Sequence, residues 1–214
     1  MREENFSSQN VKLFITAISR RGSSGTGYTV GLSDGSSFFV STAFFEENNL
    51  SVDLEIDEDL LELLEVESES IEALKKAGDL ISRAEQSSHG LFLKLKKKDY
   101  SDSACKFAVD KVVASGLLND ERYAEFWISA RLRSHPEGKS KLYAGLLSRG
   151  VASEKAKLAL ENCVSEEDLL CAVLSAGNKL LTKYEKTDQK LQNALYRRGF
   201  SSREIKYFLD NIDV

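Results

Sequence analysis

The first forty residues alternate apolar and polar side chains, which is typical of half-buried β-strands. The alternation occurs in three runs, with apolar positions at Val11, Leu13, Ile15 and Ala17, then at Tyr28, Val30 and Leu32, then at Phe38 and Val40. Asp34-Gly35 separates the second run from the third and predicts a tight hairpin turn, because Gly accepts a positive φ. The pattern therefore predicts a small β-rich front containing an antiparallel hairpin.

Beyond residue 41 the apolar positions recur every three or four residues, which is the spacing of amphipathic helices. A short helix is expected over 42–48 and an acidic one over 57–69, its buried side carrying Leu60, Leu61, Leu63 and Leu64. From Ser70 onward, Ser or Asp stands at helix starts and Gly at several helix ends. This punctuation predicts nine further helices, over 70–85, 87–98, 101–114, 119–134, 139–149, 153–163, 166–183, 187–198 and 201–212.

Three segments of the helical part align with one another. They are 95–107, 146–158 and 195–207, so their starts lie 51 and 49 residues apart. In each, a helix ends, the chain turns through Gly or Asp, one apolar residue enters the core, and Ser or Asp caps the next helix. The sequence thus predicts a mainly α protein in which three tandem three-helix repeats form a curved, elongated array behind the β-rich domain. The expected boundaries are 1–69 for the front and 70–118, 119–164 and 165–214 for the repeats.

Charge divides the chain in the same place. Residues 1–69 hold 4 Lys and Arg against 14 Asp and Glu, whereas residues 70–214 hold 25 against 20, within a total net charge of −5. Cations recur near the helix ends of the repeats, where they complement the helix dipole or form a basic edge that faces a partner or DNA. The candidates for that edge are Lys94, Lys98, Arg131, Arg133, Lys139, Arg149, Arg197 and Arg198.

No familiar catalytic or metal-binding pattern is present in the sequence. The two histidines, His89 and His135, have no Cys or paired carboxylate at ligand spacing. The glycine-rich stretch 22–27 and the string Gly138-Lys139-Ser140 lack the remainder of a phosphate-binding loop. Cys163 and Cys171 stand among apolar neighbours and are interpreted as small core residues. We therefore expect a monomeric cytoplasmic protein without catalytic residues, metal, cofactor or membrane contact.

Each of the three repeats carries a motif. The first repeat has Arg83, Ser87 and Lys94, the second has Leu118-Asn-Asp-Glu-Arg-Tyr-Ala124 with Arg131 and Gly138, and the third has Leu195-Tyr-Arg-Arg-Gly-Phe-Ser201. Over about residues 70–213 these motifs resemble those of the RecX family, the regulators of the RecA recombinase. The family-signature positions are Arg83, Ser87, Asp120, Arg122, Tyr123, Ala124, Gly138, Gly150, Gly199 and Phe200, interpreted here as largely structural.

Structural roles for the signature residues can also be predicted from their chemistry and positions alone. Asp120 is expected to cap its helix or to pair with a neighbouring Arg, and Arg122 to tie two helices together. Trp127 is interpreted as a core residue rather than a platform for a base. Surface positions are expected for Arg131, Arg133, Lys139 and Lys141. This chain departs from the family pattern at Gly90 and Gly145, which replace a Glu, and at Asp99, which replaces the turn Gly.

The resemblance implies a non-enzymatic regulator that binds RecA filaments on DNA and mostly inhibits ATP hydrolysis, strand exchange and coprotease activity in recombination, DNA repair and the SOS response. Single-stranded DNA would be contacted indirectly or weakly, because the whole chain is acidic. The alternative is a module that binds nucleic acid directly through repeats of the helix-turn-helix kind. The two hypotheses differ in the salt dependence that they predict.

Overall fold

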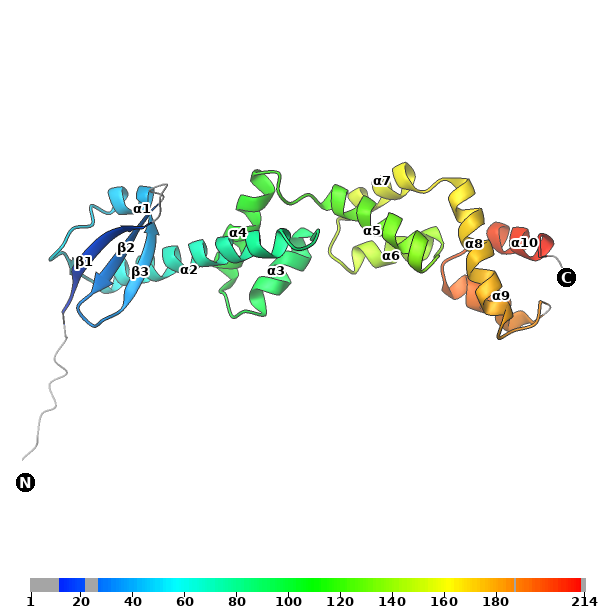
Figure 1. Ribbon diagram of the computed structural model, residues 1–214, viewed down its shortest axis with the longest axis horizontal. Helices are drawn as coiled ribbons and strands as arrows, with labels where there is room; N and C mark the ends of the chain where they lie inside the picture. Colours follow the sequence, from blue (N-terminus) through cyan, green and yellow to red (C-terminus); the bar gives the residue numbers. More distant parts are fainter. Residues whose placement is uncertain (1–11, 22–26, 187, 213–214) are drawn as a thin grey trace, which may run out of the picture. The chain divides into compact units, whose positions relative to one another are not determined.

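The computed structural model describes residues 12–21, 27–186 and 188–212 of the 214-residue chain. Its strands are β1 (Leu13–Arg21), β2 (Gly27–Leu32), β3 (Ser37–Ser41) and β4 (Glu55–Ile56). They form one antiparallel sheet in the order β3-β2-β1-β4, of which Figure 1 labels β1, β2 and β3. The predicted front is confirmed as β-rich and antiparallel, while the two-residue strand β4 is an element that the sequence pattern did not predict.

The hairpin between β2 and β3 forms as predicted. Gly35 has a φ of 90°, and the Asp34 carboxylate accepts a hydrogen bond from the Ser36 backbone over 2.9 Å. Asp34 also accepts a bond from the Ser36 hydroxyl. Both bonds act on the charged form, and they hold the pKa of the Asp34 carboxyl below its usual value. Val11 and residues 22–26 of the glycine-rich stretch lie outside the described residues.

Alternation along β1 breaks earlier than predicted. The pairing of β1 with β2 shifts register between Ile15 and Ala17, so a β-bulge lies there. A bulge adds one residue and reverses the faces that follow it. Ile15 is fully buried, whereas Ala17 is exposed and Ile18 takes the inward position. The prediction that Ala17 shares the buried face of Ile15 is therefore wrong.

The ten helices assigned within the described residues follow the predicted order. They are α1 (Thr42–Glu47), α2 (Glu58–Ile81), α3 (Ser88–Lys96), α4 (Asp102–Ala114), α5 (Asp120–Ser134), α6 (Lys139–Leu147), α7 (Ser153–Cys163), α8 (Glu166–Leu181), α9 (Gln189–Arg197) and α10 (Ser202–Asp210). None of the described helices is long and apolar enough to cross a membrane.

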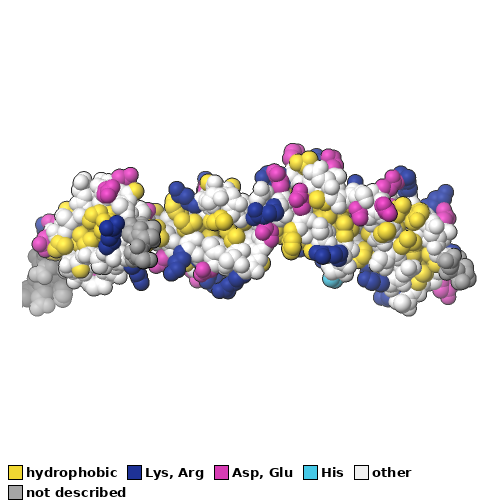
Figure 2. All heavy atoms as spheres, turned by 45° about the horizontal axis from the view of Figure 1, so that its top comes forward, with side chains coloured by type: hydrophobic (Ala, Val, Ile, Leu, Met, Phe, Trp, Pro, Cys, Tyr) yellow, Lys and Arg dark blue, Asp and Glu magenta, His cyan; other side chains and the backbone are white. Residues whose placement is uncertain are grey.

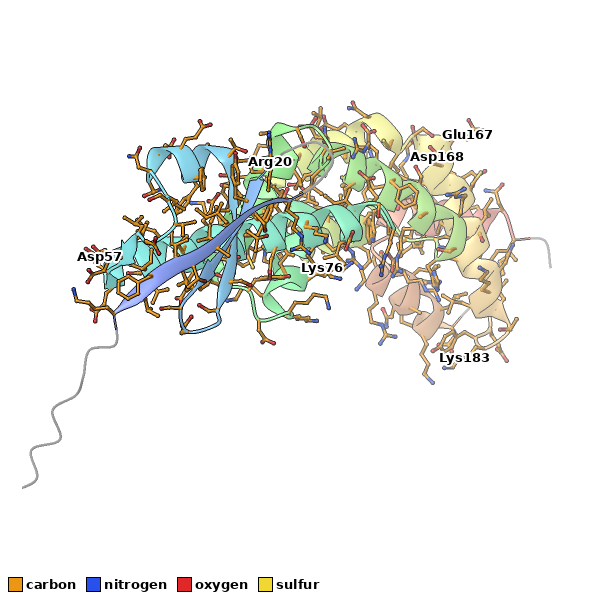
Figure 3. The ribbon with its side chains drawn as sticks, turned by 60° about the vertical axis from the view of Figure 1, so that its left-hand side comes forward. Arg20, Asp57, Lys76, Glu167, Asp168 and Lys183 are labelled. Carbon is orange, nitrogen blue, oxygen red and sulfur yellow. The ribbon has the colours of Figure 1, made fainter. Side chains whose placement is uncertain are left out.

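Helix α2 corrects two predictions. The acidic helix over 57–69 and the helix over 70–85 are a single continuous helix, because Ser70, Ala73 and Ala77 are buried on one side of it and no cap interrupts it. Leu64 is fully buried with the sheet, but Leu63 is 49% exposed and does not belong to the buried side. In Figure 3, Asp57 marks the beginning of this helix and Lys76 lies further along it.

The turn of the repeat motif has a positive φ in all three repeats, and two of the three turns share a further backbone hydrogen bond. Leu95, Leu146 and Leu195 are fully buried. Four residues later the chain enters the left-handed region, at Asp99 with φ 67°, Gly150 with φ 76° and Gly199 with φ 84°. The Val151 and Phe200 amides then donate back to the carbonyls of Leu146 and Leu195, over 3.2 and 3.3 Å. The predicted three-helix repeats with glycine-type turns are confirmed.

Capping follows the predicted pattern in two repeats and fails in the second. Ser101 and Ser201 accept hydrogen bonds from the first turns of α4 and α10. The N-cap residue of α7 is instead Ala152, which makes no side-chain capping bond; Ser153 is the first residue of the helix, and its hydroxyl bonds to the Tyr143 hydroxyl. Helix α8 opens with a complete capping box between Ser165 and Asp168, which Figure 3 labels at its first turn.

The chain divides into two compact units. One contains residues 1–78 and 95–111, and the other contains residues 79–94 and 112–214. In the second unit, Ile128, Leu142 and Leu146 centre one apolar core, and Leu191, Leu195 and Phe208 centre another. The predicted domain boundaries after residues 69, 118 and 164 stay a prediction.

Candidate partner-binding site

Most of the eight predicted edge cations have no acidic partner among the described residues. Arg131 pairs with Glu137, and no ion pair to a described carboxylate joins the other seven. Lys94 donates to the Gln86 amide oxygen, while Arg133 and Arg197 donate to carbonyls of their own helices. Lys98 is exposed and lies in the first unit, whereas Lys139 is exposed and Arg198 is half-buried in the second. Figure 2 shows Lys and Arg interleaved with Asp and Glu on the face drawn there.

A shallow hollow in the second unit gathers an aromatic ring and three cations. Its volume is about 310 Å³, and its lining includes Trp127 and Arg131 from α5, Lys141 from α6 and Arg149 just after α6. The guanidinium of Arg149 lies over the Trp127 ring, 4.6 Å from its centroid. Trp127 is half-buried against the core of the second repeat, as predicted, and its ring also supports a cation. We call this feature the Trp127 hollow.

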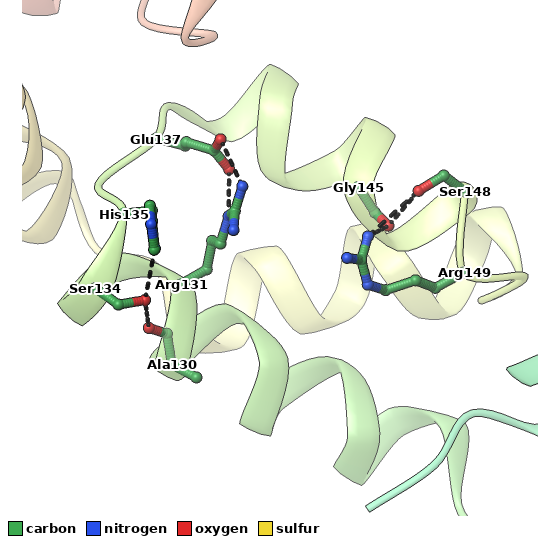
Figure 4. A network of polar contacts seen from close by, with 8 residues as sticks. All are labelled: Ala130, Arg131, Ser134, His135, Glu137, Gly145, Ser148 and Arg149. Atoms are coloured by element: carbon green, nitrogen blue, oxygen red, sulfur yellow. Dashed lines mark hydrogen bonds and ion pairs between the residues drawn. The ribbon is translucent and has the colours of Figure 1, made fainter.

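Gly145 makes this stacking possible. A Cβ on Gly145 would lie 2.4 Å from the Trp127 ring, so the ring packs where a larger residue of α6 would stand. The Gly145 carbonyl accepts a hydrogen bond from Arg149 over 2.8 Å (Figure 4). The departure from the family's Glu at this position is therefore used for packing in this chain.

Arg131 forms the opposite wall of the hollow. Its guanidinium makes two hydrogen bonds to the Glu137 carboxylate, of 2.9 and 3.1 Å (Figure 4). Bonding to this carboxylate raises the pKa of Arg131 above its usual value, so it stays charged. The prediction of an exposed surface position for Arg131 is wrong, because its bonds to the buried Glu137 hold it half-buried. Arg133, Lys139 and Lys141 are exposed as predicted.

The signature residues of α5 bind the start of α3. Asp120 accepts a 2.7 Å hydrogen bond from the Ser88 backbone at the first turn of α3. Asp120 therefore caps α3, and the expectation that it caps α5 or pairs with Arg is wrong, because Asn119 caps α5. Arg122 donates to Glu85 over 2.6 Å and to the Leu117 carbonyl over 2.9 Å, so it ties two connecting segments to α5.

Two signature glycines allow close contact between repeats. The Gly138 amide donates to the Arg198 carbonyl over 2.9 Å, and a Cβ on Gly138 would lie 2.1 Å from the Gly199 oxygen. One repeat earlier, the Ser87 hydroxyl donates to the Arg149 carbonyl over 2.8 Å. A Cβ on Gly150 there would lie 2.2 Å from the Cβ of His89.

The remaining predicted positions are structural or peripheral. Ala124 and Phe200 are buried in the two repeat cores, and Arg83 is exposed without a polar partner among the described residues. Burial raises the pKa of the half-buried Tyr123 hydroxyl, and nearby Arg149 opposes this shift. Cys163 is half-buried, but Cys171 is exposed, so its assignment to the core is wrong. No group of His, Cys, Asp and Glu able to hold a metal occurs in the described parts of the chain.

The fold and this site define a helical-repeat protein with an N-terminal sheet and a basic, aromatic hollow in its second repeat. Residues 119–160 match the family model described as RecX, second three-helix domain. The chain is 30% identical to regulatory protein RecX of Prosthecochloris aestuarii over 146 residues, covering 68% of this chain and 97% of that protein. It is 26% identical to regulatory protein RecX of Bacillus subtilis over 94% of this chain and 77% of that one. The chain belongs to the RecX family.

Solved structures agree on the fold. A crystal structure of regulatory protein RecX superimposes with a TM-score of 0.74, 20% identity and coverage of 93% of this chain and 100% of that one. The structure of RecX from Lactobacillus salivarius gives a TM-score of 0.58 at 20% identity over 67% of this chain and 98% of that one. The helical repeats and the small sheet are therefore a known arrangement.

Proposed function

We propose that this chain regulates the RecA recombinase by binding RecA filaments on DNA, and that it mostly lowers their ATP hydrolysis, strand exchange and coprotease activity. It would act in recombination, DNA repair and the SOS response, as a cytoplasmic protein without catalytic residues of its own. Membership of a family of regulatory proteins supports the regulatory part of this proposal. The observation that favours binding to an acidic surface of the partner is the Trp127 hollow.

The hollow suits an anionic group because its charges are uneven. Three cations line it, and Glu137, the carboxylate among its lining residues, is committed to Arg131. Arg149 lies over the Trp127 ring and is bonded to the Gly145 carbonyl, so less side-chain freedom is lost when it meets an anion. Lys141 is exposed and has no ion pair to a described carboxylate, so it is available to the same group.

The overall charge of the chain favours binding to an anionic group on an assembled partner rather than to free DNA. The front carries 14 of the 34 acidic residues and the net charge is −5, which repels free polyanions. A filament offers many copies of one site at high local concentration, so several weak contacts would combine into avidity.

Binding to single-stranded DNA, measured with and without RecA over a range of salt concentrations, tests this proposal. We expect strong binding to RecA-coated DNA and weak binding to the DNA alone. Tight binding to bare DNA, falling with a log–log salt slope of about −0.7 for each contacted phosphate, would instead support the nucleic-acid-binding module.

A charge reversal connects the test to the hollow. Lys141→Glu reverses the charge of an exposed cation that makes no ion pair or side-chain hydrogen bond with a described residue, and we expect it to weaken filament binding by about ten-fold. Lys179→Glu changes the same charge on the exposed side of α8 and serves as the matched control. Equal affinities of the two variants would show that the hollow is not the contact.

A further inference from the structure

The two edges of the N-terminal sheet differ in whether their outward backbone groups are hydrogen-bonded. On the β3 side, the Phe39 and Ser41 amides donate to the side chains of Ser68 and Glu67, each over 3.2 Å. Both acceptors come from α2, so this helix occupies backbone donors that an outside strand would need. The β3 edge is therefore closed to further pairing.

Among the residues that the structure describes, the β1 side is covered only at its beginning. Strand β4 pairs with Leu13 and Phe14, and the segment before β4 bonds to the amide and carbonyl of Ile15, over 3.0 and 2.9 Å. The bulge follows immediately, and residues 17–21 pair with β2 on one side only. In an antiparallel strand alternate backbone groups point away from the partner. Within the described residues, no strand or side chain accepts or supplies those outward bonds over 17–21.

Two arginines stand on this open stretch. Arg20, labelled in Figure 3, and Arg21 are exposed and make no ion pair or side-chain hydrogen bond with a described residue. Lys12, the other cation among described residues 12–69, is already paired with Glu55 at 2.7 Å. Neighbouring strand residues point to opposite faces, so the two arginines flank the edge above and below the sheet.

The surface beside the edge leaves room for an added strand. Ala17 and Ser19 are small and exposed, and they share a face with Arg21 by the two-residue period. An incoming strand would thus meet backbone groups, low side chains and two cations.

We propose that the open edge of β1 over residues 17–21 binds an extended acidic segment of a partner protein, which adds a strand to the sheet. The backbone groups supply affinity without regard to sequence, and the arginines select adjacent acidic residues, one on each face. A second copy of this chain is a poorer occupant, because its own β1 would bring the same arginines to the edge. This site is distinct from the Trp127 hollow and does not depend on the proposed action on RecA.

Arginines and bulges also occur on edge strands because they prevent aggregation. The experiment must therefore distinguish protection against aggregation from binding of a partner strand. The probe is a capped hexapeptide with Asp-Glu at its centre and Thr or Val elsewhere, titrated to millimolar concentration into the full ¹⁵N-labelled chain. We expect saturable shifts of the amides over 17–21. Hydrogen exchange should slow at alternate residues of this stretch, because the others already bond to β2.

The charge requirement is tested with a matched pair of double variants. Arg20→Glu with Arg21→Glu should weaken peptide binding by about ten-fold or more. Lys75→Glu with Lys76→Glu makes the same change in net charge on α2 and should leave binding unaltered. The same peptide with Lys-Lys at its centre should not bind the original chain.

Three results would overturn the proposal. The first is unchanged binding by the Arg20 and Arg21 variant. The second is that this variant self-associates while the original chain does not bind the peptide, which would mean that the arginines serve only to prevent aggregation. The third is an oligothymidylate probe that shifts the same amides while the peptide does not, which would make the stretch a nucleic-acid contact.

Discussion

The backbone N–H of Gly138 donates to the carbonyl oxygen of Arg198 over 2.9 Å, at the junction between the second and third repeats. The matching contact one repeat earlier joins Ser87 to the Arg149 carbonyl over 2.8 Å. Ser87 and Gly138 are 51 residues apart, as are Leu95 and Leu146 in the repeat motif. The turn after α9 is thus hydrogen-bonded to the start of α6, and the turn after α6 is hydrogen-bonded to the start of α3.

Gly138→Ala should destabilise this junction. The new Cβ would lie 2.1 Å from the Gly199 oxygen, and the neighbouring backbone has little room to move. We expect a loss of about 1–3 kcal/mol, read as a lower midpoint of urea unfolding. Gly78→Ala in α2 is the control, since nothing lies within 4 Å of its new Cβ, and it should gain roughly 0.5–1 kcal/mol. Equal midpoints of the two variants would contradict the packing described here.

Asp99→Gly tests the equivalence of the three turns in the opposite direction. Asp99 has a φ of 67° and is exposed, so it bears the cost of a side chain in the left-handed region. Glycine should stabilise the chain by up to about 1 kcal/mol in thermal unfolding. Gly150→Ala, which creates a contact of 2.2 Å with His89, should destabilise it. A fall in stability in the Asp99 variant would argue against the shared geometry.

Acid should weaken the capping box of α8. The Ser165 hydroxyl and amide donate to the Asp168 carboxylate over 2.6 and 3.0 Å, and these bonds hold its pKa below the usual 3.8. Because the folded pKa is the lower one, the stabilisation is present above the unfolded pKa and is lost as the pH falls through the folded value. The thermal midpoints of the original chain and Ser165→Ala should therefore begin to converge as the pH falls towards 3.8, and should coincide once it has fallen below the lowered pKa of the folded chain. A constant difference would exclude this linkage.

Trp127 is the single tryptophan of the sequence, so its fluorescence reports on the hollow directly. Arg149→Ala uncovers the face of the ring, and we expect a red shift of the emission maximum because water replaces the guanidinium. Arg133→Ala removes an exposed arginine that bonds only to the Ser129 carbonyl of its own helix, and it should leave the spectrum unchanged. Identical spectra for the two variants would show that Arg149 does not cover the ring in solution.

Local signals were sufficient to predict the repeats. The spacing of Leu95, Leu146 and Leu195 and the turn residues after them depend on neighbours along the chain, and the helix ends fall within a few residues of the expected ones. The break expected at Ser70 followed a change in composition. Continuity of α2 depends instead on what packs against Ser70 and Ala77, which the sequence alone does not display.

Partners distant in sequence explain the other differences. The Asp120 carboxylate accepts a bond from Ser88, which is 32 residues away in the sequence. Asp120 lies next to the residue that caps α5, Asn119, so the sequence made Asp120 an equally reasonable cap for that helix. The bulge after Ile15 and the short strand β4 depend on sheet pairing. The sequence showed the basic residues of the hollow singly, and only the fold brings Arg149 and Lys141 to one aromatic ring.

The most direct measurement of the proposed regulation is the rate of ATP hydrolysis by RecA on single-stranded DNA, titrated with this chain. We expect the rate to fall as the chain is added, and Lys141→Glu to require about ten-fold more protein than Lys179→Glu for the same inhibition. An unchanged rate at several-fold excess over RecA would contradict the proposed function.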